Sequence, residues 1–419
     1  MSVATDATVG VSRRSILGGI AGVSASALVL HPHAFARSAT PAASPAASPA
    51  SDEVATIQQL IEAAKDEFGL RAILATVRRG DDDIVLTAIG ESLTGVPATT
   101  DMYFRNGAVA ISLVSTLMLI LVDKGTFALD DTIARWLPDL PDADSVTFRQ
   151  LSNMTSGYRD YVQSTDFQNA QQANPFHSFT REELLGYSFD QPRIFAPGKN
   201  WEYSHTGYQI LGMAIEAATG ETVQNLMQRM VLDPLGLTQT FAYQTATIPE
   251  PVLHAFTSER RESLQVPKGV RFYEESTFWD PAWTITRGAV QVQTLRDFAT
   301  AMQAVGRGTL LSKASYEAMT GPSLVGFGHP QEGCNSCQTV GLPGKLDYGL
   351  GVFRHNGWLV QSPLFAGYGG ASGYHPEHDL TVAVEVTYSE DAYDADGGYK
   401  ATQSYTTLFD RIGAVLTGA

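Results

Sequence analysis

The chain has 419 residues, of which 44% are hydrophobic and 17% are charged, so most of its length can form a packed core. Its formal net charge is −16, and no basic stripe offsets the acidic residues, which argues against nucleic acid as a partner. With 38 glycines and 20 prolines, the composition indicates a turn-rich globular protein.

The first 36 residues resemble an export signal. Ser12-Arg13-Arg14-Ser15 is a twin-arginine pattern, an apolar stretch follows to Leu30, and Ala34-Phe35-Ala36 is a small-x-small cleavage site. A membrane anchor is the alternative, but this run is shorter than the roughly 20 apolar residues that a span needs. We expect cleavage, twin-arginine export to a secreted or cell-envelope location, and no stable membrane span afterwards. Residues 37–53, rich in Ala, Ser and Pro, predict an extended linker before a domain over 54–419.

Hydrophobic periodicity predicts the elements of that domain in chain order. A helix over 54–68 precedes two strands over 72–78 and 84–89, which a turn after Gly80 joins. The middle is mostly helical, with helices expected over 111–122, 206–219 and 295–305. Strands return over 348–353, 358–361 and 380–387, and a helix over 403–416 closes the chain. Strands at both ends predict that the two ends meet in one sheet, with a helical lobe and a substrate cleft against it.

The two cysteines, Cys334 and Cys337, lie three positions apart in a loop-like string. A zinc ribbon needs a second pair of ligands, and a thioredoxin-type redox pair needs a βαβ context; the sequence offers neither. In an exported protein the pair predicts a local disulfide. No metal site and no cofactor is expected.

Six short sequence strings follow one another in a fixed order within residues 54–419. They are Phe104-Arg-Asn-Gly107, Trp136-Leu-Pro-Asp-Leu-Pro141, Pro197-Gly-Lys-Asn-Trp-Glu-Tyr203, Asp233-Pro-Leu-Gly-Leu237, Tyr348-Gly-Leu-Gly351 and Tyr374-His-Pro-Glu377. Together they resemble the serine β-lactamase-related family of class C β-lactamases, D-alanyl-D-alanine carboxypeptidases and related esterases. The resemblance implies an α/β fold of the β-lactamase and penicillin-binding-protein type. That fold is an antiparallel sheet flanked by helices, plus an all-helical lobe, with the active site between them.

The first motif of that family, S-x-x-K, places a serine nucleophile and its lysine one helical turn apart, so that the amine reaches the hydroxyl. After Phe104-Arg-Asn-Gly107 the sequence instead has Ala108 at the serine position and Ile111 at the lysine position. No lysine elsewhere has a serine three residues before it. The resemblance therefore implies that nucleophile and base are both lost.

The other two family motifs are also altered. Tyr203-Ser-His205 stands where the family has Tyr-x-Asn, so a tyrosine remains and a histidine replaces the amide. The frame set by the flanking strings puts Gln361-Ser362-Pro363 at the third motif, K-T-G or H-T-G, although a gapped placement at Tyr368 is an alternative. Proline there removes a backbone donor.

These departures predict a pseudoenzyme whose cleft is kept for ligand binding. The candidate binding residues are Tyr203, His205, Gln361, Ser362 and Tyr368, and a peptidoglycan-type peptide or another extracellular small ligand is the expected partner. One alternative is an active serine hydrolase with a relocated nucleophile, Ser112 or Ser115, further along the same apolar helix. The other is a structural or interaction module without a ligand.

Overall fold

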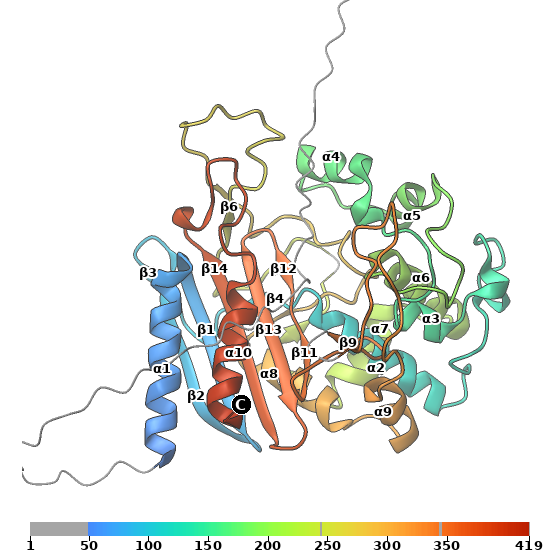
Figure 1. The fold of residues 1–419 in the computed structure, drawn as a ribbon, viewed down its shortest axis with the longest axis horizontal. Coiled ribbons are helices and arrows are strands. Elements are labelled where there is room, and N and C mark those ends of the chain that lie inside the picture. The colour runs from blue at the N-terminus through green and yellow to red at the C-terminus, as the bar shows by residue number, and fades with distance from the viewer. Residues whose placement is uncertain (1–48, 244, 343–345, 419) are drawn as a thin grey trace, which may run out of the picture.

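One antiparallel sheet joins the two ends of the chain. Strand β1 (Leu70–Arg79) pairs with β2 (Asp82–Leu93) on one side and with the late strand β14 (Leu380–Tyr388) on the other, with Ala75 opposite Val384. The prediction that early and late strands meet is therefore confirmed (Figure 1). The computed structural model describes residues 49–243, 245–342 and 346–418, so the predicted signal peptide and most of the linker lie outside it.

The sheet has nine strands in the order β3-β2-β1-β14-β13-β11-β10-β9, and β12 pairs with β13 off this path. The remaining bounds are β3 Val96–Pro97, β9 Asp347–Tyr348, β10 Phe353–His355, β11 Trp358–Gln361, β12 Leu364–Phe365 and β13 Tyr368–His375. Two small sheets lie outside it: β4 (Phe104–Arg105), β8 (Val292–Gln293) and β5 (Thr240–Phe241) form one, and β6 (Phe256–Thr257) and β7 (Glu274–Glu275) form the other.

Helices cover both faces of the large sheet. On one face α1 (Pro49–Glu67) and α10 (Ser404–Thr417) pack on the valines of β14 in one hydrophobic cluster. On the other face α8 (Leu295–Arg307) packs between the sheet and the lobe. Helix α1 begins at Pro49, so the last residues of the predicted linker, 49–53, are helical. The hydroxyl of Thr56 donates to the carbonyl of Asp52 one turn earlier.

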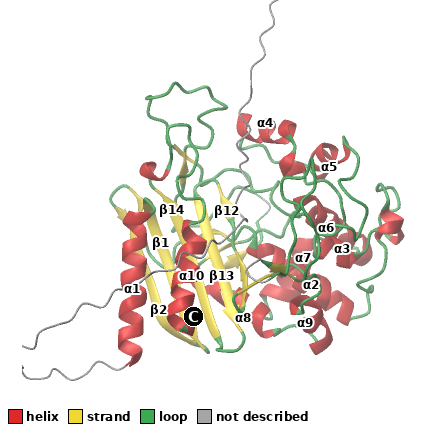
Figure 2. Ribbon diagram, viewed as in Figure 1, coloured by secondary structure: helices red, strands yellow, loops and turns green. Residues whose placement is uncertain are grey.

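The middle of the chain forms the helical lobe (Figure 2). Its central helix α2 (Val109–Asp123) is buried along almost its whole length, as its unbroken apolar sequence predicts. The other helices are α3 Phe148–Ser152, α4 Thr165–Ala173, α5 Arg181–Phe189, α6 His205–Thr219, α7 Val223–Met227 and α9 Lys313–Thr320. Short 3-10 or π turns are η1 Ile133–Arg135, η2 Ala143–Ser145, η3 Tyr161–Gln163, η4 Gln228–Leu232 and η5 Glu390–Ala392.

One strand prediction was wrong, and one strand was missed. The expected strand over 348–353 is two strands, β9 and β10, because the chain turns between them at Gly351, where φ is +78°. Strand β13 was not predicted, since its glycines hide the strand signal. A Cβ at Gly373 would lie 2.7 Å from the ring of Phe409 in α10, so this strand needs glycine for the helix to approach.

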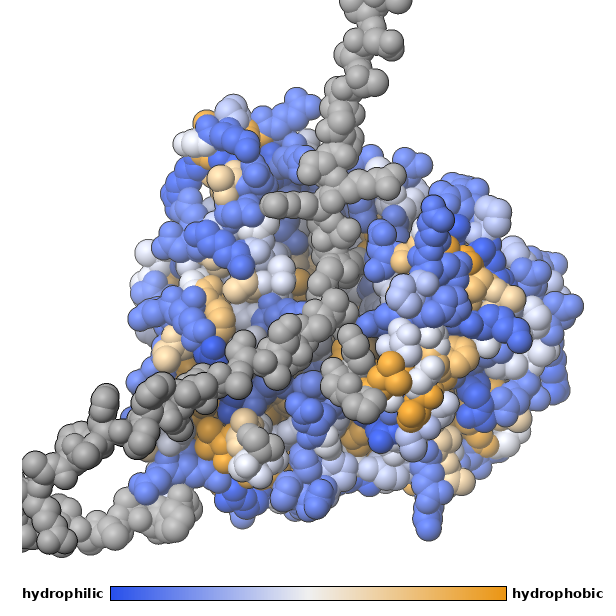
Figure 3. Space-filling view, in the orientation of Figure 1, coloured by the Kyte–Doolittle hydropathy of each residue, from blue (hydrophilic) through white to orange (hydrophobic). Residues whose placement is uncertain are grey.

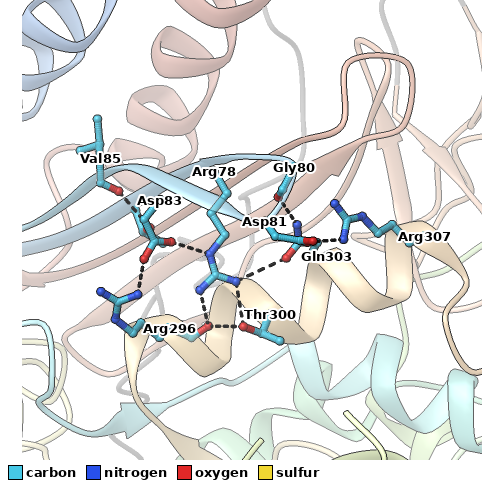
Figure 4. A network of polar contacts seen from close by, with 10 residues as sticks. Arg78, Gly80, Asp81, Asp83, Val85, Arg296, Thr300, Gln303 and Arg307 are labelled. Atoms are coloured by element: carbon cyan, nitrogen blue, oxygen red, sulfur yellow. Dashed lines mark hydrogen bonds and ion pairs between the residues drawn. The ribbon is translucent and has the colours of Figure 1, made fainter. Parts of the chain in front are cut away.

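A polar network fastens α8 to the turn between β1 and β2 (Figure 4). The guanidinium of Arg78, which is 8% exposed, lies 2.7 Å from Asp83 and donates to Thr300 at 2.8 Å. Gln303 donates to the carbonyl of Gly80 at 2.5 Å. Helix α8 and the sheet are therefore joined by largely buried hydrogen bonds as well as by apolar packing.

Candidate functional site

The candidate site lies where the helical lobe meets the sheet, and we call it the junction site: residues 105–111, 203–205, Trp283 and 361–365. Its first part is the start of α2. Ala108 is the N-cap residue and is partly exposed, and its methyl group makes no capping hydrogen bond. Ile111, one turn on, is 1% exposed. Neither side chain carries a group that can attack, donate or accept a proton.

The second part is the end of β11, where Gln361 pairs with Ser372 of β13. Pro363 lies directly against the start of α2: a Cβ placed on Gly107 would lie 2.4 Å from the Cβ of Pro363. The carbonyl of Pro363 accepts from the backbone N–H of Gly370 at 2.9 Å. The ungapped placement of 361–363 therefore puts this segment beside Ala108.

Two of the predicted binding residues are already engaged in the fold. The amide of Gln361, which is 1% exposed, donates to the carbonyl of Gly351 at 2.7 Å. The hydroxyl of Tyr368, 2% exposed, donates to the carbonyl of Leu253 at 2.5 Å. These contacts do not favour the predicted role of Gln361 and Tyr368 in ligand binding, whereas Ser362 is partly exposed.

The two alternative nucleophiles, Ser112 and Ser115, are fully buried. Ser112 donates to the carbonyl of Gly351 at 2.5 Å, and Ser115 lies 2.9 Å from the hydroxyls of both Ser152 and Tyr208. Burial raises the pKa of Tyr208 to about 12, so its hydroxyl is a poor base at neutral pH. These serines therefore connect α2 to neighbouring elements, and we find no activating base beside them among the described residues.

Two residues of the second-motif string, Tyr203 and His205, lie beside a buried aspartate, Asp160. Nδ1 of His205 lies 3.0 Å from Oδ2 of Asp160, and the backbone N–H of His205 donates to Oδ1 at 3.1 Å. The Asp160 side chain is 1% exposed, whereas that of His205 is 13% exposed. The ring of Tyr203 meets that of His205 edge-on at 5.4 Å, and burial raises the pKa of Tyr203 far above its usual value.

Sequence reasoning missed Asp160 and the aromatic residues around His205. The ring centroid of Trp283 lies 6.2 Å from that of His205 and 5.8 Å from that of Phe365 in β12. The ring of Tyr203 stacks on that of Phe353 in β10, with the centroids 6.2 Å apart. Asp160 is 45 positions from His205, and no motif or spacing connects the two. Trp283, Phe353 and Phe365 are not part of the family strings, so only the fold brings them together with Tyr203 and His205.

A buried carboxyl group adjoins the pair. Glu202 is 4% exposed, its Oε2 has no partner among the described residues, and Oε1 accepts a long hydrogen bond, 3.5 Å, from Ser336. Burial, with a smaller contribution from Asp160, raises the pKa of Glu202 to about 8. Ser336 lies between Cys334 and Cys337, whose predicted disulfide is present.

No group of three or more metal-ligating side chains occurs within residues 49–243, 245–342 and 346–418.

In the same described ranges no helix is long and apolar enough to cross a membrane. The face shown in Figure 3 is largely hydrophilic, with small and separate hydrophobic patches.

An antiparallel sheet with helices on both faces, a helical lobe and a site at their junction define the serine β-lactamase and penicillin-binding-protein class of fold. A family model described as Beta-lactamase matches residues 57–404. The chain therefore belongs to the beta-lactamase family, as the sequence strings predicted.

The individual relatives share only about a third or less of their aligned residues with this chain. Esterase EstB of Burkholderia gladioli is 27% identical over 355 residues, which are 74% of this chain and 88% of that protein. Penicillin-binding protein 4* of Bacillus subtilis (strain 168) is 30% identical over 164 residues, 38% of this chain and 34% of that protein, so the match spans about a third of that relative.

Solved structures share the fold. D-amino acid amidase from Ochrobactrum anthropi SV3, complexed with L-phenylalanine amide, superposes with a TM-score of 0.69 at 22% identity over 88% of this chain and 99% of that one. A penicillin-binding protein from Bacillus halodurans gives 0.64 at 18% identity, over 85% and 98%. At these identities the likeness establishes the fold alone.

Proposed function

We propose that the protein is an exported ligand-binding member of the beta-lactamase family that forms no acyl-enzyme. The observation that carries this proposal is the start of α2, where Ala108 has only a methyl group and Ile111 is buried. Acyl transfer by this fold needs a hydroxyl nucleophile with a base in reach. Losing one member of such a constellation can cost roughly 10⁶-fold in kcat.

Three features support a retained binding site. Tyr203, His205 and Ser362 are partly exposed at the junction, and Asp160 holds His205 in a fixed orientation. Some relatives are penicillin-binding proteins, so a peptidoglycan-type peptide is our first candidate ligand and another extracellular small molecule is the second. We propose a secreted or cell-envelope location on the twin-arginine pattern of residues 12–17.

The alternative of an active hydrolase has less support. Its proposed nucleophiles, Ser112 and Ser115, are buried and already hydrogen bonded. The third hypothesis is a structural or interaction module without a ligand. A measured affinity for a ligand would distinguish the ligand-binding protein from such a module.

Intact-mass spectrometry with a fluorescent penicillin and a fluorophosphonate tests the absence of an acyl-enzyme. We expect no adduct on the full chain, and a stoichiometric adduct mapped to Ser112 or Ser115 would establish the active-hydrolase alternative. Titration with a soluble peptidoglycan stem peptide tests binding, which Tyr203→Ala should abolish. N-terminal sequencing of the secreted protein should begin near Arg37; a cytosolic protein starting at Ser2 would contradict export.

A further inference from the structure

A continuous row of aromatic rings crosses the junction site. It runs Phe353, Tyr203, His205, Trp283, Phe365, with successive ring centroids 6.2, 5.4, 6.2 and 5.8 Å apart. The two ends, on β10 and β12, are 4% and 6% exposed, whereas the three middle rings are partly exposed. The row therefore offers ring surface to a ligand at its centre and is anchored in the core at both ends.

The centre of the row also carries hydrogen-bonding groups with defined directions. A carboxylate only accepts hydrogen bonds, so Asp160 fixes the hydrogen of His205 on Nδ1 and leaves Nε2 of the neutral ring as an acceptor. Nε2 makes no hydrogen bond to another described residue. Nε1 of Trp283 is buried without a partner in the described part of the chain, and it can only donate. The row thus offers one acceptor, Nε2 of His205, to a ligand, whereas Nε1 of Trp283 lies below the surface.

The charges around the row favour a neutral ligand. The guanidinium of Arg105, 6.0 Å from the ring of Phe365, is 3% exposed and already donates to the backbone carbonyls of Thr277 and Ala246. Ile111, in the same hydrophobic cluster as Tyr203, supplies no ammonium group that could pair with a ligand carboxylate. The carboxylate of Asp160 already accepts hydrogen bonds from the ring of His205 and, at 3.3 Å, from the backbone N–H of Val162. Glu202, with its pKa raised by burial, is largely protonated at neutral pH and adds little charge.

From these observations we propose that the row binds a neutral aromatic amide. The aromatic ring of the ligand packs against Tyr203 and Trp283, and the amide N–H donates to Nε2 of His205. Aromatic contact and one directed hydrogen bond then set specificity together. This inference names the ligand class of the proposed binding site and rests on that proposed function.

Four small probes separate the parts of the proposal, with affinities measured by NMR titration of the full chain. N-benzylacetamide carries both ring and amide, 4-phenylbutan-2-one replaces the N–H by CH₂, N-methylacetamide lacks the ring, and phenylacetate carries a carboxylate. We expect N-benzylacetamide to bind about fivefold more tightly than 4-phenylbutan-2-one. Its advantage over N-methylacetamide and over phenylacetate should be larger than fivefold.

Variants then assign the contacts. Trp283→Ala should lower the affinity for N-benzylacetamide about tenfold, and Trp283→Phe should recover part of that loss in affinity. His205→Phe keeps a ring but has no Nε2, so it should abolish the preference over 4-phenylbutan-2-one. Trp136→Phe is the matched control, because Trp136 packs on Phe127 and Phe148 within the lobe and should leave all affinities unchanged. Circular dichroism establishes that each variant is folded.

Equal affinity for N-benzylacetamide and N-methylacetamide, no binding of N-benzylacetamide at millimolar concentration, or a folded Trp283→Ala that binds as the wild type does would each overturn the inference. If the stem peptide binds while the four probes are not discriminated, this inference fails and the proposed function stands. If penicillin or the fluorophosphonate acylates the chain, the proposed function fails whatever the probes show.

Discussion

Pro363 closes directly on Gly107, at the start of α2, so that a Cβ on the glycine would lie 2.4 Å from the Cβ of the proline. Gly107 has φ of +47°, a region that side chains avoid. The contact brings the sheet edge against the helix end that carries Ala108. The segment to which the third family motif was assigned thus fills space beside Ala108.

Gly107→Ala should destabilise the protein by about 2–4 kcal/mol, because strained backbone and steric overlap with Pro363 add together. Urea unfolding measures the change. Gly95→Ala is the control: its φ is +77° but nothing lies within 4 Å of the added methyl, so it should cost only about 1 kcal/mol. Equal losses in the two variants would mean that Pro363 moves away freely.

Restoring the first motif should not restore activity. We expect Ala108→Ser combined with Ile111→Lys to form no penicillin adduct and to turn over nitrocefin no faster than buffer. The lysine would occupy a position that is 1% exposed, where desolvation lowers its pKa or destabilises the fold. Pro363 would also still lie against Gly107. Rapid nitrocefin hydrolysis by the double variant would show that only two substitutions separate the chain from a working hydrolase.

The sequence predicted five of the α-helices, α1, α2, α6, α8 and α10, and the pairing of early and late strands, because α2, β1 and β14 are strongly apolar. It could not predict β13, where glycines serve close packing with helices. The flanking strings placed the third motif at residues 361–363, and in the structure Pro363 lies against Gly107, beside Ala108. Asp160 could not be found, since a hydrogen bond across 45 positions leaves no local pattern.

Arg78 should be a strong contributor to stability. Its buried guanidinium binds Asp83 and reaches Thr300 and Gln303 in α8 (Figure 4). Arg78→Ala leaves these partners without their donor, and we expect a loss of about 2–4 kcal/mol in urea unfolding. The neighbour Arg79, whose side chain is 47% exposed beside Glu53, gives the control, and Arg79→Ala should change stability by no more than about 0.5 kcal/mol.

Glu202 should make stability depend on pH. Its pKa is about 8 in the folded protein, against 4.5 as the ordinary value, so the folded state holds a proton that the unfolded state releases between these pH values. The stability linked to this proton is complete below pH 4.5 and is lost as the pH rises to about 8. Glu202→Gln cannot ionise and should escape that loss, gaining on the wild type by up to roughly 5 kcal/mol at pH 8 and above.

Urea unfolding of wild type and Glu202→Gln at half-unit steps from pH 5 to 9 measures this difference. The advantage of the variant should grow steadily to about pH 8 and then level off, because both states of the wild type are ionised beyond that point. Glu262→Gln, at an exposed position, should show no such growth. A difference between wild type and Glu202→Gln that stays constant with pH would mean that Glu202 is already ionised in the folded protein, through water reaching the buried Oε2 or a shift of the Ser336 loop.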